Sequence, residues 1–163
     1  MVALLASSAL GGVAAAKSAK PVDLTVAGTI GGKAKGGKVA CTTYQLAPDA
    51  PESFAVSYDN LKIHGKRYNF NVGIEPYAAV TADLADPSSG ATVDFGRTKT
   101  DDEQWSTFAP AGPIGSGTLT INVDKKTGAF DAELGPKEGP TTPEGPVHVS
   151  GTFACKKVSP AQP

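Results

Sequence analysis

The residues best suited to chemistry in this chain are two cysteines and two histidines. Cys41 lies in the segment GGKVACTTYQL and Cys155 in VHVSGTFACKK, and the only histidines are His64 and His148. An even pair of cysteines in a secreted protein is typical of a disulfide bond, so we expect Cys41 and Cys155 to be joined. Two free buried thiols or a metal pair are the alternatives, but a zinc site built from these four residues would follow no known spacing.

Catalysis by a nucleophile needs an adjacent base and a group that orients the base. Ser116 lies in GPIGSGTL, which has neither the Gly-x-Ser-x-Gly spacing nor a strand-to-helix turn. We expect His64 at an exposed hairpin tip and His148 on the polar face of its strand. An active site would require residues as distant as His64, Asp101 and His148 to cluster. We therefore predict that the protein is not an enzyme and has no catalytic residues and no cofactor.

Acidic and aromatic side chains offer further candidate sites. Residues 101–103 read Asp-Asp-Glu and could bind calcium, but they lack the alternating Asp-x-Asp-x-Asp-Gly spacing, so we expect a solvated loop and no metal site. Trp105 follows in a polar segment, where it could contact a sugar or a protein, or else cap the end of the core. The possible contact residues of the chain are Trp105, Tyr44 and Tyr77.

Composition limits the fold and the partners. The chain has 163 residues, enough for one domain, with 19 glycines and 13 prolines, which is typical of short strands joined by many turns. Its net charge of −1 and its isoelectric point near 6.1 argue against nucleic acid as a partner. The N-terminal part of the chain is mildly basic and should form a solvated face, with contact to an anionic surface as the alternative; it contains Lys17, Lys20, Lys33, Lys35, Lys38 and Lys62.

The N-terminus is typical of a secretory signal. An apolar run covers Val2–Ala16 and ends in three alanines, a pattern that signal peptidase accepts, although no positive charge precedes the run. We expect residues 1–16 to be removed and residues 17–163 to form a single domain that is secreted, periplasmic or at the cell surface. A buried or interfacial alanine-rich helix is the alternative for this segment.

Alternation of apolar and polar residues predicts about eight or nine strands and, after the signal, no convincing helix. Residues 53–77 should form a hairpin with a two-residue turn at Gly65–Lys66 and a β-bulge at Asp59–Asn60. Residues 117–134 should form a second hairpin, with Gly128 as its left-handed turn residue. The expected fold is an antiparallel β-sandwich, or a flattened barrel, with one disulfide.

Three segments carry a resemblance to a known family. The early strand VACTT, the hairpin GTLTINVDKKTGAFDAEL and the last strand VHVSGTFAC resemble the layout of small secreted bacterial β-sandwich proteins of the mycobacterial 19 kDa lipoprotein antigen group. The resemblance covers Val39–Cys155 and implies a secreted or cell-envelope location and a sandwich fold, but no reaction. The chain departs from that group in lacking the cysteine that carries the lipid anchor.

Three functions remain open at this stage. The first is a secreted or cell-envelope protein that acts through surface contacts with an unknown protein, envelope or lipid partner. The second is a carrier of an apolar small molecule or lipid, with Phe54, Tyr68, Phe70 and Phe130 lining a dry cavity, although these rings could simply fill a core. The third is a self-assembling subunit that lends its Pro21–Ile30 strand to a neighbour. That strand folding back onto its own sheet is the alternative.

Overall fold

The computed structural model describes residues 22–98, 103–139 and 142–160. Within these ranges the chain is all β and contains no α-helix; its one helical segment is the 3-10 turn η1 (Pro87–Ser89). No helix in the described ranges is long and apolar enough to cross a membrane. The strands are β1 (Val22–Gly28), β2 (Gly32–Lys33), β3 (Lys38–Tyr44), β4 (Ser53–Ile63), β5 (Lys66–Ile74), β6 (Thr81–Asp83), β7 (Ala91–Arg97), β8 (Gln104–Ser106), β9 (Phe108–Ala109), β10 (Gly112–Pro113), β11 (Ser116–Ile121), β12 (Thr127–Pro136), β13 (Val147–Ala154) and β14 (Val158–Pro160).

The number of long strands agrees with the prediction from alternation. Among the described residues, eight strands have six or more residues, and they are β1, β3, β4, β5, β7, β11, β12 and β13. The other six strands have two or three residues each, too few for an alternating pattern to be visible in the sequence. The predicted signal segment, residues 1–16, lies outside the described residues.

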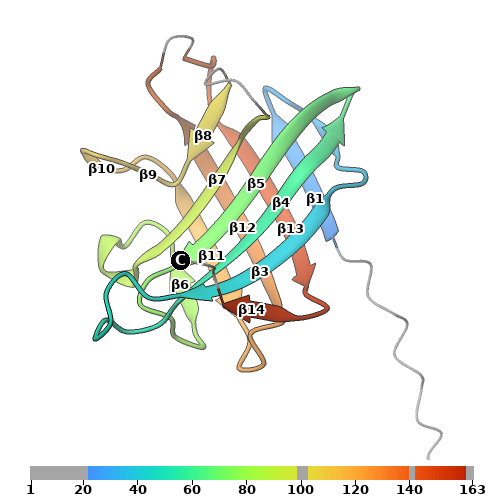
Figure 1. Cartoon of the computed structure of the whole chain (residues 1–163). Helices are drawn as coiled ribbons and strands as arrows, with labels where there is room; N and C mark the ends of the chain where they lie inside the picture. The colour runs from blue at the N-terminus through green and yellow to red at the C-terminus, as the bar shows by residue number, and fades with distance from the viewer. Residues whose placement is uncertain (1–21, 99–102, 140–141, 161–163) are drawn as a thin grey trace, which may run out of the picture.

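One curled sheet accounts for most of the fold (Figure 1). Its strand order is β14-β3-β4-β5-β7-β8-β12-β13-β1-β2, with β11 beside β12 and β6 beside β11; β9 and β10 form a small separate hairpin. Within this sheet only β14, which runs parallel to β3, departs from the antiparallel pattern. Because the sheet curls, β3, β4, β5 and β7 cross over β11, β12 and β13 (Figure 1). The predicted all-β, largely antiparallel architecture is confirmed.

The interior of the curl is filled by aromatic rings from both halves of the sheet. Phe70 of β5 meets Phe130 of β12 with ring centroids 4.6 Å apart, and Phe54 of β4 meets Phe153 of β13 at 6.3 Å. All four side chains are at most 3% exposed. Aromatic pairs at such separations contribute about 0.5–1.5 kcal/mol beyond the area they bury. These contacts hold the two halves together across the core.

Trp105 belongs to this core and not to the surface. Its side chain is 1% exposed, its ring lies 5.9 Å from that of Phe95, and its indole Nε1–H donates to Gly145 O at 3.0 Å. The proposed role of Trp105 as a contact residue is therefore wrong, and the alternative, a cap on the core, is correct. Its neighbours in β8 are not simply at the surface: Gln104 is half-buried, whereas Ser106 is 2% exposed and accepts a hydrogen bond from the Phe108 N–H.

The β4–β5 hairpin has its turn one residue earlier than predicted. Ile63 pairs with Lys66, so the two turn residues are His64 and Gly65. Both have positive φ, 48° and 80°, which is typical of a type I′ turn rather than the predicted type II′. The β-bulge predicted at Asp59–Asn60 is confirmed by the shift of register there.

In the β11–β12 hairpin, Gly128 does not occupy the turn. Lys125 is the residue with left-handed backbone, φ 54°, and Gly128 pairs with Ile121 inside β12. A Cβ on Gly128 would lie under 3.0 Å from the Phe153 ring, so the glycine makes room for that ring. Val123, which lies within the segment 117–134 predicted to be a hairpin, is in the turn and is 85% exposed.

The two ends of the curled sheet are tied together at two places. The predicted disulfide between Cys41 of β3 and Cys155, just after β13, is confirmed; it joins residues 114 apart in sequence across a Cα–Cα distance of 6.1 Å. At the other place, Ala34 N–H donates to Leu24 O at 2.9 Å, and Lys35 forms a bridge with Lys62 of β4. The segment around β2 thus connects β1 to β4.

The predicted N-terminal strand pairs within its own chain. β1 runs alongside β13 over seven residue pairs, from Val22↔Phe153 to Gly28↔Val147. Its other edge carries β2. The strand predicted at Pro21–Ile30 is therefore folded back onto its own sheet, which was the alternative to its exchange with a neighbouring subunit.

Candidate functional site

The two histidines have different partners and do not form one site with each other. His148 Nε2 lies 2.7 Å from Asp131 Oδ1 on the outer face of the β12–β13 pair. His64 Nε2–H donates instead to the carbonyl oxygen of Gly31. Asp101, the third residue considered for a cluster, and its neighbour Asp102 lie outside the described residues. Within the described part of the chain, no three His, Cys, Asp or Glu side chains are arranged to hold a metal ion.

Tyr44 and Tyr77 hold loops together at the end of the sheet where β3 and β5 finish. The Tyr44 hydroxyl donates to Glu75 Oε2 at 3.4 Å, and burial, followed by the Glu75 charge, raises the pKa of Tyr44. The Tyr77 hydroxyl donates to Asn122 O at 3.2 Å, and Lys125 Nζ lies 4.5 Å above the ring. Both tyrosines remain half-buried, so a role in contacting a partner stays a prediction for them.

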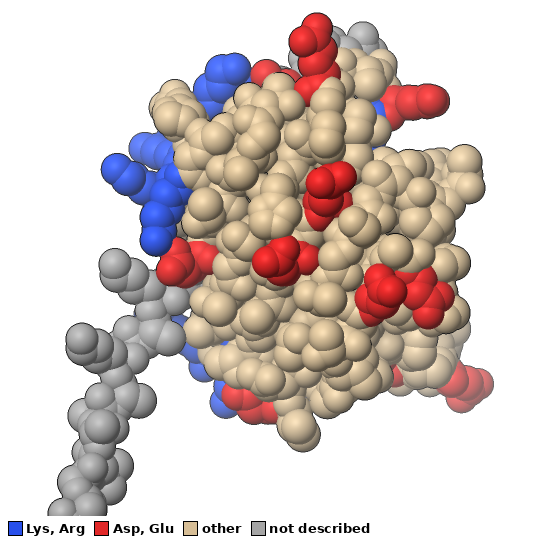
Figure 2. Space-filling view, turned by 180° about the vertical axis from the view of Figure 1, so that it is seen from behind, with Lys and Arg blue, Asp and Glu red and all other residues tan. Residues whose placement is uncertain are grey.

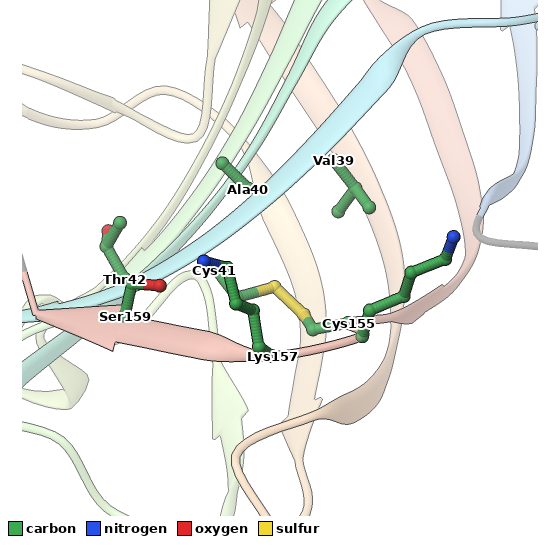
Figure 3. Close-up of a pocket in the computed structure, with 8 residues that line it drawn as sticks. Val39, Ala40, Cys41, Thr42, Cys155, Lys157 and Ser159 are labelled. Carbon is green, nitrogen blue, oxygen red and sulfur yellow. A yellow bond between two sulfur atoms is a disulfide. The ribbon is translucent and has the colours of Figure 1, made fainter.

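A recess of about 290 Å³ lies beside the disulfide (Figure 3). Val39, Cys41 and Thr42 of β3 form one side, and Cys155, Lys157 and Ser159 form the other. The disulfide itself is well covered, with Cys41 4% and Cys155 9% exposed.

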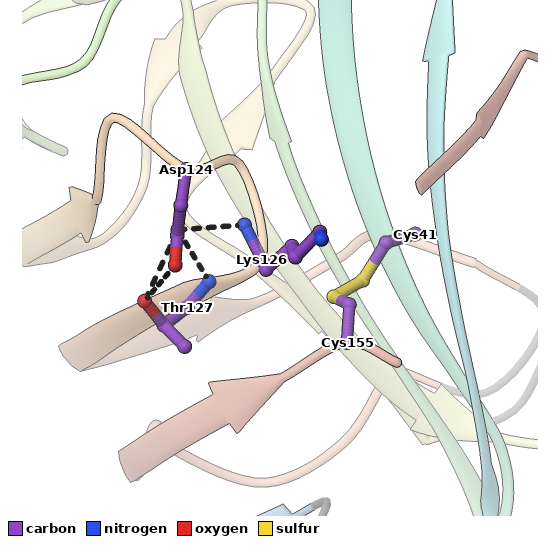
Figure 4. The surroundings of a disulfide bond; sticks show 5 residues. All are labelled: Cys41, Asp124, Lys126, Thr127 and Cys155. Atoms are coloured by element: carbon purple, nitrogen blue, oxygen red, sulfur yellow. Dashed lines mark hydrogen bonds between the residues drawn. A yellow bond between two sulfur atoms is a disulfide. The ribbon is translucent and has the colours of Figure 1, made fainter. Parts of the chain in front are cut away.

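The β11–β12 turn lies beside the disulfide (Figure 4) and contacts the chain at Cys155. The Asp124 carboxylate accepts hydrogen bonds from the backbone N–H groups of Lys126 and Thr127, and the bond from Lys126 is the main reason why the pKa of Asp124 is lowered. Lys126 O in turn accepts from the Cys155 N–H at 2.7 Å. These contacts fix Cys155 in place beside the turn.

A second and larger hollow, of about 500 Å³, lies between the β2 segment and the tip of the β4–β5 hairpin. We call it the basic groove; its lining residues are Gly32, Lys33, Lys35, Lys62, Ile63, His64 and Gly65. The volume is within the range of about 300–1,000 Å³ that small-molecule sites occupy. The groove is therefore large enough for a small ligand or one group of a larger one.

Two lysines of the basic groove lie side by side. Lys35 and Lys62 are directly paired in an antiparallel bridge, so their side chains leave the same face. That face is the outer one, because the neighbouring Leu61 and Ile63 are buried. On the other side of Lys62, the paired residue of β5 is Arg67. Like charges directly opposite in a sheet are unfavourable by roughly 0.2–1 kcal/mol per pair. The row formed by Lys35, Lys62 and Arg67 therefore lowers the free energy of unfolding.

Neighbouring cations have acidic partners. Lys33 Nζ lies 2.7 Å from Asp23 Oδ1, and Lys66 Nζ lies 3.4 Å from Glu103 Oε1. In the part of the chain that the structure describes, no acidic side chain forms an ion pair with Lys35, Lys62 or Arg67. Figure 2 shows most of the blue side chains of that view at the upper left margin, with a few at the lower left, while red ones are spread over the rest. On this face, positive charge is thus concentrated at one margin.

His64 makes the wall of the basic groove rigid. Its left-handed backbone in the turn brings the ring across to Gly31, where Nε2–H donates to the carbonyl oxygen. Gly32 lies so close that a Cβ there would be 3.0 Å from both His64 Nε2 and Ile63 Cγ2. The hairpin tip and the β2 segment are therefore held together by the His64 ring and by the close approach of Gly32 to it.

The basic lysines were assigned to a solvated face from the sequence, and their alignment was missed. Lys35 and Lys62 meet through an isolated bridge between segments far apart in the chain, which no local pattern indicates.

Comparison of the chain with protein-family models, with curated proteins and with solved structures gave no match.

Proposed function

We propose that the protein is an extracytoplasmic binding protein that holds an anionic partner in its basic groove and carries out no catalysis. The observation that carries the proposal is the direct pairing of Lys35 with Lys62, next to Arg67, with no acidic partner among the described residues. This arrangement is unfavourable for folding, and an anion placed between the ammonium groups would relieve it.

Location outside the cytoplasm is supported by the disulfide between Cys41 and Cys155, because such bonds persist mainly in oxidising compartments. Binding rather than catalysis is supported by the use of His64, the imidazole of the groove, in a structural hydrogen bond to Gly31 O. We regard the curled sheet as a flattened barrel that serves as a rigid scaffold for the hairpin tip.

Two other functions have less support. A carrier of an apolar molecule would need room where Phe70 and Phe130 pack against each other at 4.6 Å, in the middle of the core. A subunit that lends its first strand would have to break the seven-residue pairing of β1 with β13 before it could pair with a neighbour. The basic groove requires neither rearrangement.

The proposal is tested by equilibrium binding to polygalacturonate, a polymer of carboxylated sugars, with neutral dextran as the control ligand. The variant Lys35→Gln/Lys62→Gln removes two charges from the groove. The matched variant Lys156→Gln/Lys157→Gln removes two exposed charges elsewhere.

Exposed ion pairs contribute roughly 0.2–1 kcal/mol each, so we expect the groove variant, which loses two charges, to bind up to about thirtyfold more weakly and the matched variant to bind like the wild type. Added salt should weaken binding of the wild type, because exposed charges are screened. Equal losses in the two variants, or equal binding to dextran, would show that the groove is not the site.

A further inference from the structure

The basic groove presents two ammonium groups at directly opposite positions. Cβ atoms of directly opposed residues in an antiparallel pair lie roughly 4.5–5.5 Å apart. The flexible four-carbon stems of Lys35 and Lys62 can therefore bring both Nζ atoms to the oxygens of one bound group. Lysine acts on such a group as a mobile point charge, in contrast to the planar fork of arginine.

Charge matching favours a doubly charged group over a singly charged one. A phosphate monoester carries roughly −1.5 to −2 charges at neutral pH and has three acceptor oxygens, whereas a carboxylate carries one charge and two oxygens. Two unneutralised lysines thus match one phosphate monoester in charge, and each ammonium group can reach an oxygen of its own. Arg67, opposite Lys62, extends the positive field along the same face.

The groove leaves room for such a group at Gly65. Gly65 lines the groove, and no atom outside its immediate neighbours lies within 4 Å of the position that a Cβ would take. Main chain without a side chain is the setting in which a compact oxyanion can come close to peptide groups.

From these observations we infer, on the basis of the proposed function, that the basic groove recognises the phosphate monoester group of its ligand through Lys35 and Lys62. The group could belong to a soluble phosphate ester or to the headgroup of a lipid with a terminal phosphate. Both sources present the same chemistry to the groove.

The test has two arms. In the first, glycerol phosphate is titrated into the ¹⁵N-labelled protein, and amide shifts are followed by NMR, with sodium acetate at equal ionic strength as the carboxylate control. In the second, vesicles containing phosphatidic acid are compared with vesicles of pure phosphatidylcholine by co-sedimentation. Each arm uses the wild type, Lys35→Gln/Lys62→Gln, and Lys35→Arg/Lys62→Arg, which retains both charges.

We expect saturable shifts in residues 32–35 and 62–65 with glycerol phosphate, an affinity at least fivefold lower in the glutamine variant, and substantial retention in the arginine variant. This result identifies a soluble phosphate ester as a sufficient ligand. Binding confined to phosphatidic acid vesicles, and lost in the glutamine variant, assigns the phosphate to a lipid headgroup. Folding of each variant is verified from its amide spectrum.

Acetate and glycerol phosphate acting alike would overturn the inference. If polygalacturonate binds through the groove and neither phosphate source does, phosphate recognition is wrong while the anionic function stands. If no anionic probe binds at the groove, both proposals fail.

Discussion

Removal of the disulfide should destabilise the protein strongly. The variant Cys41→Ala/Cys155→Ala opens a loop that spans 114 positions of sequence. In the chain-entropy model, closing a loop of about that length lowers the conformational entropy of the unfolded chain and stabilises the folded state by roughly 4–5 kcal/mol at 25 °C. Both cysteines are nearly buried, so the lost sulfur contacts add to this cost. The total is a large share of the roughly 5–15 kcal/mol by which folded domains are stable.

The assay is urea unfolding followed by tryptophan fluorescence. Trp105 is the only tryptophan and is 1% exposed, so its emission reports on the core. We expect the free energy of unfolding to fall by about 4–5 kcal/mol and the midpoint of thermal unfolding by about 10–20 °C. The urea m-value should rise, because the unfolded chain without the bond exposes more surface.

Wild-type protein reduced with dithiothreitol provides the control, because it lacks the bond but keeps both cysteines. It should unfold within about 1 kcal/mol of the alanine variant. A loss below about 1 kcal/mol in both samples, with an unchanged m-value, would refute the reasoning. The pairing of β14 with β3 would then be what holds the end of the sheet in place.

Three further outcomes follow from the packing and the charges. Gly128→Ala should cost about 1–3 kcal/mol in urea unfolding, because the new methyl group would lie under 3.0 Å from the Phe153 ring; unchanged stability would contradict that contact. Burial raises the pKa of Tyr58 well above its usual value. Its contribution to stability is therefore complete below about pH 10 and is lost as pH rises from there towards the folded-state pKa, and Tyr58→Phe should flatten that alkaline decline; an equally steep decline would contradict it. Lys62→Gln should raise stability by roughly 0.2–1 kcal/mol in thermal unfolding by removing repulsion from Arg67, and a loss would show that the lysine is structurally engaged.

The sequence was sufficient to predict the long strands and the disulfide. Alternation over β4 and β5 identified the hairpin and its bulge, because one face of each strand is buried and the pattern is therefore strict. The turn was placed one residue too late because Gly65 can occupy either central position of a two-residue turn. His64 adopts a positive φ of its own, which no residue type guarantees.

Features set by long-range packing were beyond local reasoning. The sequence pattern assigned Gly128 to a turn. A glycine is needed there because the Phe153 ring of β13 occupies the space that a Cβ would take. Trp105 lay among polar residues, and only the curl of the sheet carries it into the core. The basic groove depends on the bridge between Lys35 and Lys62, which forms only after β1 and β4 are brought together. The sequence does indicate that Lys62 alternates with the buried residues Leu61 and Ile63 and therefore faces outwards.

The central claim, that an anionic partner occupies the basic groove, is tested most directly by lysine footprinting. The protein is acetylated with and without saturating polygalacturonate, and the modification of each lysine is measured by mass spectrometry. We expect Lys35 and Lys62 to be protected by the polymer, with Lys156 and Lys157 acetylated equally in both samples. Uniform protection of all four lysines, or protection confined to Lys156 and Lys157, would contradict the claim.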